Sequence, residues 1–200
     1  MGRIVVSEFV SLDGVMEDPG GAEGTRNAGW TFRFGRGSEG DRFKLDEVLE
    51  AEALLLGRVT YEGFAKAWPS IDDPVGFAAK MNAMPKYVVS NTLSDEDATW
   101  HNSTILRGEA ATEVRALRDK VAGDLLVAGS AQLVQTLVEH RLVDEYRLMV
   151  FPIVLGSGKR LFGDVSEAPV LTLNDTATIG GGIVVLTYHP AAGVADEHAA

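Results

Sequence analysis

Two turns in the sequence combine glycine with residues that can bind a negatively charged ligand. The first, Gly57-Arg58-Val59-Thr60, follows a run of leucines and opens a helical pattern. Free backbone N–H groups at a helix start attract anions, and an arginine and a hydroxyl there add a charge and a donor. The turn therefore predicts an anion site, although a plain strand-to-helix turn with a surface arginine explains the same residues.

The second turn is Gly129-Ser130-Ala131, which also lies between a strand pattern and a helical one. Glycine lets a backbone approach a ligand closely, and serine caps helices. Capping alone is a sufficient explanation if this turn is considered by itself. Ser90-Asn91-Thr92 ends another strand pattern with three hydrogen-bonding side chains, which suit a phosphate or ribose and equally an ordinary turn.

Several other chemistries are excluded by what the sequence lacks. It has no cysteine, which excludes disulfides, thiolate nucleophiles and cysteine metal sites. Neither a Gly-x-Ser-x-Gly elbow nor a His-Glu-x-x-His motif occurs. The four histidines are scattered without ligand spacing. We therefore expect no bound metal.

Charge and hydropathy limit the partners. The net charge of −11 and the lack of a basic cluster argue against binding to nucleic acid. No apolar run reaches the roughly 18 residues of a membrane span, and no signal-peptide core is recognisable. With no cysteine in the chain, we expect a cytoplasmic protein without a membrane partner. An anionic cofactor would have to be bound locally, by a helix N-terminus and one arginine.

Strand and helix patterns alternate along the chain, which predicts an α/β fold. We expect a mixed, mainly parallel sheet with helices on both faces and a C-terminal antiparallel hairpin. A single domain is expected over 1–190, followed by a flexible tail over 191–200. Ligands of such sheets bind beyond the carboxyl ends of the strands, where the turns described above lie. The predicted strands are 3–10, 53–56, 86–90, 103–106, 124–128, 144–151, 170–179 and 182–189, and the predicted helices are 41–52, 58–67, 75–84, 109–122 and 131–140.

In this order, the turns make the sequence similar to the dihydrofolate-reductase-like superfamily. It most resembles the C-terminal reductase domain of bacterial bifunctional riboflavin deaminase-reductases and its stand-alone relatives. The resemblance extends from about Arg3 to His189 and implies the three-layer dihydrofolate-reductase-like fold. It is carried by Ser11-Leu12-Asp13-Gly14, Gly57-Arg58-x-Thr60-Tyr61-Glu62, Val89-Ser90, Gly129-Ser130, Leu142-Val143-Asp144-Glu145 and Pro152-x-x-Leu155-Gly156-x-Gly158.

The resemblance also implies a cofactor. Arg58 and Ser90 would face the adenosine 2′-phosphate, which implies NADPH rather than NADH. The Gly129 turn would hold the pyrophosphate, with Ser130 in place of the usual second glycine. Phe9 would lie against the nicotinamide through its backbone. The full set expected to bind the cofactor is Phe9, Gly57, Arg58, Thr60, Ser90, Asn91, Thr92, Gly129, Ser130 and Ala131.

Catalytic and substrate residues follow from the same resemblance. Dihydrofolate reductases carry a carboxylate on the helix before the Gly-Arg-x-Thr turn, and Asp41 falls near that position. Asp41 is also a good helix N-cap, so both interpretations stay open. Asp13, in the loop expected beside the nicotinamide, is a second catalytic candidate. An apolar pocket from Phe9, Val15, Trp30, Phe34 and Val154 would suit a flat ring, although a plain core role explains some of these residues as well. The full set expected to bind the substrate is Val15, Trp30, Val154, Leu155 and Gly156.

We therefore expect an NADPH-dependent reductase that transfers a hydride to a small, flat heterocyclic substrate. The long 13–40 stretch favours a paralogue of the riboflavin-pathway reductase. The chain lacks His-x-Glu with Cys-x-x-Cys, so we do not expect the bifunctional enzyme. One alternative is a true dihydrofolate reductase, although the segment around Trp30 lacks the usual Pro-Trp. Another is a non-catalytic nucleotide- or small-molecule-binding protein. We expect a homodimer, because such relatives commonly pair and strand 144–151 is apolar.

Overall fold

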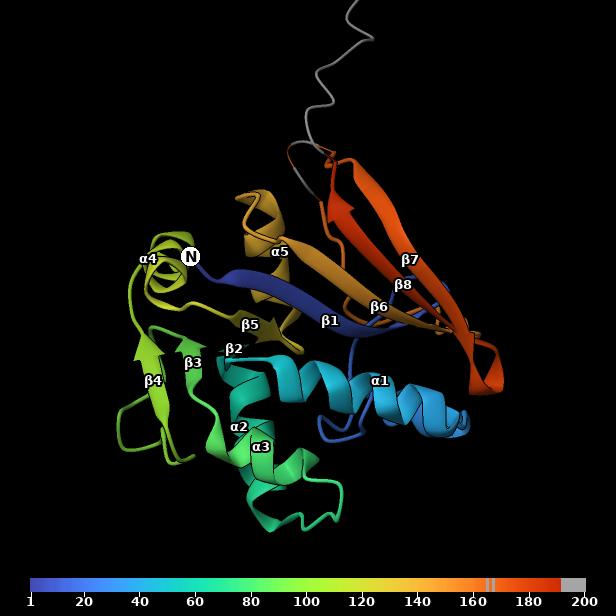
Figure 1. The fold of residues 1–200 in the computed structure, drawn as a ribbon, viewed down its shortest axis with the longest axis horizontal. Coiled ribbons are helices and arrows are strands. Elements are labelled where there is room, and N and C mark those ends of the chain that lie inside the picture. Colours follow the sequence, from blue (N-terminus) through green and yellow to red (C-terminus); the bar gives the residue numbers. More distant parts are fainter. Residues whose placement is uncertain (165, 167, 192–200) are drawn as a thin grey trace, which may run out of the picture.

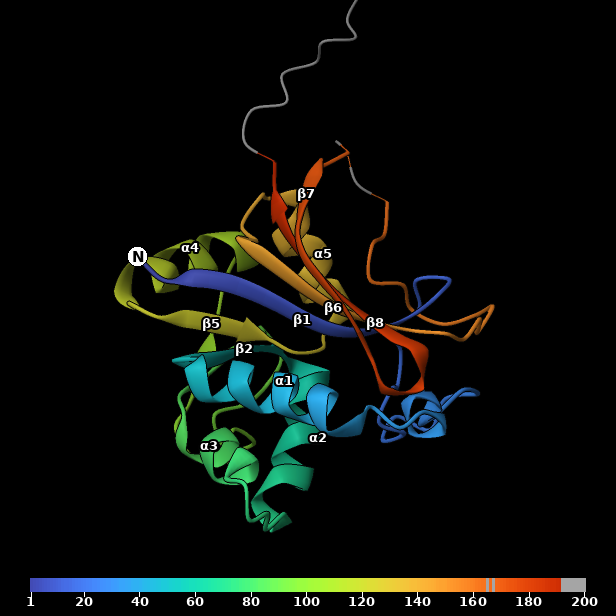
Figure 2. The same ribbon diagram turned by 45° about the vertical axis from the view of Figure 1, so that its right-hand side comes forward.

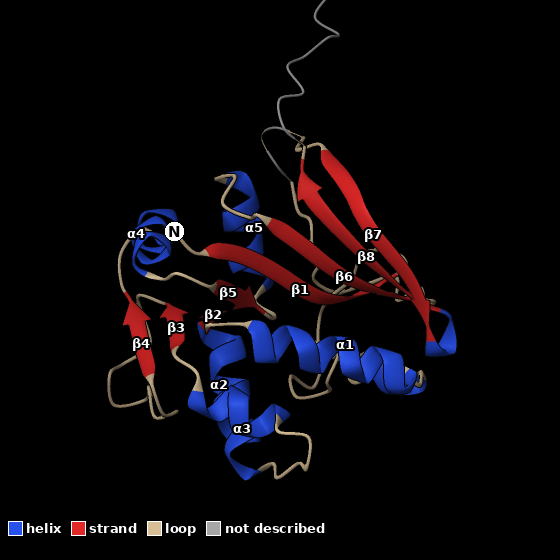
Figure 3. Ribbon diagram, in the orientation of Figure 1, coloured by secondary structure: helices blue, strands red, loops and turns tan. Residues whose placement is uncertain are grey.

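The structure is a computed structural model that describes residues 1–164, 166 and 168–191. The helices pack around a single sheet of strands (Figure 3). The strands are β1 (Arg3–Ser11), β2 (Ala53–Gly57), β3 (Lys86–Val89), β4 (Ser103–Leu106), β5 (Asp124–Val127), β6 (Glu145–Phe151), β7 (Leu171–Ile179) and β8 (Ile183–Pro190). The helices are α1 (Gly37–Glu50), α2 (Arg58–Ala67), α3 (Phe77–Ala83), α4 (Ala110–Lys120) and α5 (Ala131–Glu139), with 3-10 turns η1 (Trp30–Arg33), η2 (Trp68–Ser70) and η3 (Gly180–Gly182).

These strands form one sheet in the order β4-β3-β2-β5-β1-β6-β8-β7 (Figure 1). The first six strands of that order are mutually parallel. β8 runs antiparallel to both β6 and β7, which makes the closing hairpin. The predicted mixed sheet with a C-terminal antiparallel hairpin is confirmed.

Helices cover both faces of the sheet. α4 and α5 lie on one face and α1, α2 and α3 on the other (Figures 1 and 2). The central strands are buried on both sides, so their sequences are nearly continuous runs of apolar residues. In β1, for example, Ile4 and Val6 pack with the core under α4 and α5, whereas Val5 between them packs with the core under α1, α2 and α3. Three layers result.

A third apolar cluster lies beside the hairpin and stabilises the long segment after β1. Its centre is Phe151 at the end of β6, which makes edge-on ring contacts with Phe9, Trp30 and Phe34. Aromatic pairs of this geometry add roughly 0.5–1.5 kcal/mol beyond the area that they bury. The glycine-rich stretch 13–40 is therefore anchored to the sheet by Trp30 and Phe34.

Three expectations need correction or stay open. α1 begins at Gly37 rather than at the predicted Asp41. β6 pairs on one side with β1 and on the other with β8, so its apolar character reflects the interior of this sheet. It offers no free edge to a second chain, and the predicted homodimer loses that reason. Of the predicted tail 191–200, residues 192–200 lie outside the described residues.

Candidate active site

The main cleft opens where β1 extends beyond its neighbour β5. The two strands pair only as far as Val6 and Val127, after which the second half of β1 pairs with β6 alone in the described sheet. The turns after β2, β3 and β5 all reach this opening at the carboxyl ends of their strands, where ligands of α/β sheets bind. The cleft has a volume of about 2070 Å³, and α1, α2, α3 and the loop 16–23 complete its walls.

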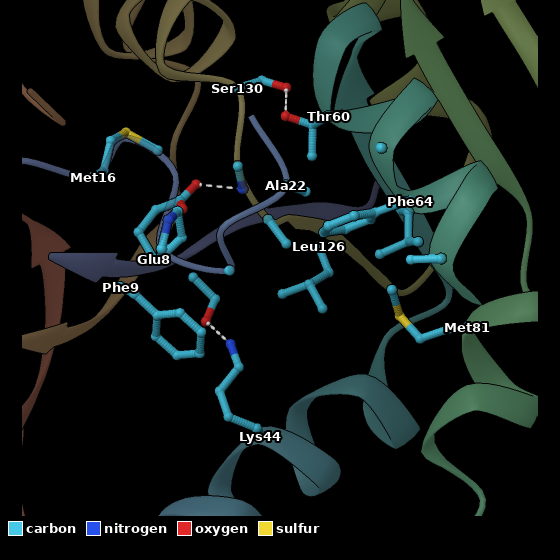
Figure 4. Close-up of a pocket in the computed structure, with 18 of the residues that line it drawn as sticks. Glu8, Phe9, Met16, Ala22, Lys44, Thr60, Phe64, Met81, Leu126 and Ser130 are labelled. Carbon is cyan, nitrogen blue, oxygen red and sulfur yellow. Dashed lines mark hydrogen bonds between the residues drawn. The ribbon is translucent and has the colours of Figure 1, made fainter. Parts of the chain in front are cut away.

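The two glycine turns interlock at one end of the cleft. Ser130 Oγ accepts a hydrogen bond from the Gly57 amide at 2.8 Å and donates one to Thr60 Oγ1 at 2.8 Å (Figure 4). A Cβ atom on Gly57 would lie 2.7 Å from Ser130 Oγ, and one on Gly129 would lie 2.8 Å from Thr60 Cγ2. Both glycines are thus required by the close approach of the turns.

This end of the cleft has features that suit phosphate groups. Within the described part of the chain, no side chain caps α2 or α5, so the amides of their first turns stay available to an anion. The Arg58 guanidinium is half exposed, and its ion pair with Glu62 is long at 3.8 Å. Ser90 Oγ accepts from the amides of Thr92 and Leu93 at 3.1 and 2.9 Å, and its own proton meets only a long contact of 3.4 Å with Thr92 Oγ1, which a ligand can replace.

The structure brings together in the cleft lining the residues that the sequence suggested for the cofactor. Each residue expected to bind the cofactor lines the cleft, although the positions are spread over four segments of the chain. Asn91 differs from the others because its side-chain amide exchanges hydrogen bonds with the backbone of Gly108 at 3.0 and 2.7 Å. It therefore holds the turn after β3 in shape. The residues brought together are Phe9, Gly57, Arg58, Thr60, Ser90, Asn91, Thr92, Gly129, Ser130 and Ala131.

Phe9 and Phe34 of the expected apolar pocket line the cleft, whereas the five residues expected to bind the substrate do not. Val15 is buried and pairs through its backbone with Arg160. Trp30 is fully buried, and its indole N–H donates to the carbonyl of Glu17 at 2.8 Å. Val154 is exposed, while the amides of Leu155 and Gly156 bind the Asp13 carboxylate at 3.0 and 2.8 Å.

Asp13 connects two loops outside the cleft lining. Its carboxylate accepts from the Leu155 and Gly156 amides and from Ser11 Oγ at 2.7 Å. The bond from the Leu155 amide, followed by that from Ser11, lowers the pKa of Asp13 to about 2. The carboxylate is therefore ionised at neutral pH, and in this structure it holds the loop after β1 against the loop after β6.

Asp41 lines the cleft but does not cap α1. The N-cap is Arg36, and Asp41 lies inside the helix, so the capping interpretation is wrong. Its side chain is largely exposed, and Oδ1 lies 2.9 Å from an Arg36 guanidinium nitrogen. Its place in the lining agrees with the expected position of a carboxylate on this helix.

Sequence reasoning missed the polar residues on β1 and their partners on α1. Glu8 is only 6% exposed, and its Oε1 accepts from the Gly129 amide at 2.8 Å. Ser7, on the opposite face of β1, hydrogen-bonds to both carboxylate oxygens of Glu47 and accepts from Lys44 Nζ at 2.9 Å. Lys44 also forms an ion pair with Glu47. The available signal was the polar pair Ser7-Glu8 inside an otherwise apolar strand.

Burial controls the charge of Glu8. Desolvation raises the pKa of Glu8 to about 8, and the Gly129 amide and the distant charge of Lys44 only partly oppose this. Its carboxyl group is therefore mostly protonated at neutral pH. In Figure 4, Glu8, Phe9 and Met16 lie on one side of the cleft, and Phe64 and Met81 lie on the other.

A compact loop forms another wall. Asp18 is buried, and its carboxylate accepts from the amides of Glu23 and Thr25 at 2.9 and 3.0 Å. Burial alone would raise the pKa of Asp18, but these bonds lower it overall. Lys159 ties the loop to the segment after β6 through Glu17 at 3.2 Å and Glu23 at 3.5 Å. The loop is thus shaped before any ligand binds.

The described residues contain no group of three or more histidine, aspartate or glutamate side chains placed to hold a metal ion. Among the helices that the structure describes, none is long and apolar enough to cross a membrane.

With this geometry in place, comparison with known proteins identifies the family. The family model of the RibD C-terminal domain matches residues 3–185, which is most of the chain. The chain belongs to the RibD C-terminal domain family. This confirms the resemblance seen in the sequence and indicates a reductase-like domain.

Individual relatives agree with this assignment. The uncharacterized protein YyaP of Bacillus subtilis (strain 168) is 30% identical over 192 residues, and the match covers 94% of each chain. Among solved structures, a protein from Shewanella sp. PV-4 provisionally assigned to riboflavin biosynthesis superposes with a TM-score of 0.76 at 21% identity, over 94% of this chain and 99% of that one.

Two further structures place the fold in a wider context. A diaminohydroxyphosphoribosylaminopyrimidine deaminase/5-amino-6-(5-phosphoribosylamino)uracil reductase of Thermotoga maritima has a TM-score of 0.64 at 15% identity, over 95% of this chain and 57% of that one. A dihydrofolate reductase of Enterococcus faecalis, solved with NADP(H), has a TM-score of 0.55 at 16% identity, over 94% of this chain and 96% of that one. The dihydrofolate-reductase-like fold is thereby confirmed.

Proposed function

We propose that this RibD C-terminal domain is an NADPH-dependent reductase that transfers a hydride to a small, flat, pyrimidine-like heterocycle. The observation that carries the proposal is the interlocked pair of turns around Gly57 and Gly129, which join two uncapped helix starts at one cleft. Two adjacent helix N-termini suit the several phosphates of a dinucleotide better than one phosphate alone.

The chain's own residues fit this cofactor. The first turns of α2 and α5 would bind the pyrophosphate, because a side chain at Gly57 or Gly129 would fill the space that the backbone needs. Arg58 and Ser90 would bind the adenosine 2′-phosphate, since Arg58 has a free face and the Ser90 hydroxyl keeps its proton. When bound, NADPH supplies a hydride from its nicotinamide ring.

The cleft also has room for a second ligand. Its volume of about 2070 Å³ exceeds the roughly 300–1000 Å³ that is usual for one small-molecule site. The part away from the glycine turns is walled by apolar side chains of α1, α2, α3 and β5. Such a wall suits the faces of a flat ring, and it includes Leu45, Leu49, Phe64, Met81 and Leu126.

A true dihydrofolate reductase is the second candidate, and one observation favours it. Asp41 lies on α1 and lines the cleft, as the carboxylate of such an enzyme would. Its exposed side chain and its ion pair with Arg36 weigh against it, because a cation already holds the carboxylate and solvent surrounds it.

The test is oxidation of NADPH followed by absorbance with a panel of acceptors. We expect turnover with a pyrimidine or a related flat ring. We do not expect methotrexate-sensitive reduction of dihydrofolate. Methotrexate-sensitive reduction of dihydrofolate that is lost in Asp41→Asn would establish the second candidate instead. NADPH binding without reduction of any acceptor would favour a non-catalytic binding protein.

Two expectations about the protein in the cell accompany this proposal. We propose that it acts in the cytoplasm, where NADPH is available, and that it works as a homodimer. Light scattering of the purified protein tests the dimer, since a species with the mass of one chain would contradict it.

A further inference from the structure

Glu8 is a carboxyl group placed inside an apolar strand at the edge of the cleft. It lies two residues beyond the last pair that joins β1 to β5, so the backbone beside it is open to the cleft. Its Oε1 accepts from the Gly129 amide at 2.8 Å. Its Oε2 has no hydrogen-bond partner among the described residues and is not sealed from solvent. One oxygen is therefore fixed, and the other is free to meet a ligand.

The surroundings of Glu8 favour its neutral form. Two charged groups act on it, both from α1: Lys44, which favours ionisation, and Glu47, which opposes it. Lys44 is already paired with Glu47 and bonded to Ser7 on the other face of β1, so it gives Glu8 no ion pair. An unpaired, buried carboxylate is costly, and the group instead keeps its proton. Burial accordingly raises the pKa of Glu8 to about 8.

The other acids of this region differ from Glu8. Asp13 lies outside the cleft lining, and its hydrogen bonds lower its pKa to about 2. Asp18 is bound to the amides of its own loop, which also lower its pKa. Asp41 is exposed and paired with Arg36. Glu8 alone among these four combines a place in the cleft lining, an orientation fixed by a backbone amide and a second oxygen without a hydrogen-bond partner among the described residues.

We propose that Glu8 is the general acid of this site and that it gives its Oε2 proton to the heteroatom of a C=N or C=O bond in the acceptor. This role rests on the proposed reductase function. It also deepens that function, because it defines the acceptor as a molecule with a polarised double bond to nitrogen or oxygen. An isolated carbon–carbon double bond would have no heteroatom for this proton.

Reduction of the acceptor combines a hydride transfer with a proton transfer. The acceptor carbon gains the hydride from NADPH, and the electron pair of its double bond moves to the heteroatom. The heteroatom then takes the proton from Glu8 Oε2, so the O–H bond of Glu8 breaks and a carboxylate remains. Solvent water reaching Oε2 returns the proton after the product leaves. The Gly129 amide at Oε1 stabilises the carboxylate in the meantime.

The test compares Glu8→Gln with wild type, with Glu50→Gln on the exposed end of α1 as the matched control. Glutamine keeps the shape and an acceptor for Gly129 but has no acidic proton. We expect single-turnover reduction of the acceptor to slow by about 100-fold or more. The dissociation constant of NADPH should change by less than about twofold, because only the chemical step loses an interaction. In wild type the rate should fall as pH rises through about 8.

Infrared spectroscopy provides a measurement that does not depend on turnover. At neutral pH the ligand-free protein should show the C=O stretch of a protonated carboxyl group, which should be present in Glu50→Gln and absent in Glu8→Gln. Lack of this band in wild type would overturn the proposal. Turnover by Glu8→Gln at the wild-type rate, with normal NADPH binding, would overturn the role of Glu8 alone. If the wild-type protein does not bind NADPH, the reductase function fails and the role of Glu8 with it.

Discussion

Replacing Gly129 by alanine tests whether the two glycine turns, around Gly57 and Gly129, interlock as the structure indicates. Gly129 has a φ of +84°, where a residue with a Cβ costs about 1–2 kcal/mol. The new Cβ would also lie 2.8 Å from Thr60 Cγ2 and 3.0 Å from its Oγ1, and crowding of this kind adds about 1–3 kcal/mol. The lower entropy of the unfolded chain offsets about 0.4–1 kcal/mol.

Together these effects predict a loss of about 2–4 kcal/mol in the free energy of unfolding. For a chain of this size that corresponds to a fall of about 5–15 °C in Tm, measured by differential scanning calorimetry. NADPH binding should weaken too, because Thr60 must move away from the Gly129 turn.

The control is Gly76→Ala. Gly76 has nearly the same φ, +86°, but nothing lies within 4 Å of a Cβ built on it, so it reports backbone strain alone. Adding Thr60→Ala to Gly129→Ala removes the crowding atoms and should restore part of the lost stability. If Gly129→Ala destabilises the protein no more than Gly76→Ala does, the close approach of the turns is refuted.

Three other perturbations have defined outcomes. Ser130→Ala loses the hydrogen bonds to the Gly57 amide and to Thr60. It should lower the free energy of unfolding, measured by urea titration, by about 1–3 kcal/mol. An unchanged free energy of unfolding would mean that these bonds are dispensable. The pKa of Glu8 is about 8 in the folded protein and 4.5 when unperturbed. Between these two pH values only the folded protein keeps the proton, so the free energy of unfolding should fall as the pH rises from 4.5 to about 8. The loss is at most about 5 kcal/mol and should be flattened in Glu8→Gln; an unchanged slope in that variant would contradict the assignment. Asp13 makes stability depend on pH in the opposite direction. Because its pKa is lowered to about 2 in the folded protein, its contribution to stability should be lost as pH falls from the ordinary aspartate pKa of 3.8 toward about 2. Asp13→Asn should remove that loss in acid titrations followed by circular dichroism.

The sheet could be predicted from the sequence because its central strands carry a strong local signal. Leu54, Leu55 and Leu56 form a short apolar run that ends at a glycine, and the structure has β2 at that place. The sequence does not reveal the true start of α1, because Arg36 is not a typical N-cap residue, whereas Asp41 is. The helix is held there by packing, which a local pattern does not express.

The candidate site could be predicted only in part, for a similar reason. The end of the cleft proposed for the cofactor is built from short turns whose residues are adjacent in the chain, as in Gly129-Ser130. The far end depends on how the long segment after β1 folds back. Trp30 becomes a core residue against Phe151, whereas Met16, Phe32 and Phe34 of the same segment line the cleft. The role of Glu8 depends on its burial, which the sequence suggests only through a polar residue in an apolar strand.

The most direct test of the central claim is a titration of the protein with NADPH and with NADH, followed by nucleotide fluorescence. We predict that NADPH binds more tightly than NADH, and that Arg58→Ala removes most of this preference by removing the charge that faces the 2′-phosphate. Arg115→Ala, on the exposed face of α4, should leave both affinities unchanged. Failure of NADPH to bind, or an unchanged preference in Arg58→Ala, would contradict the account.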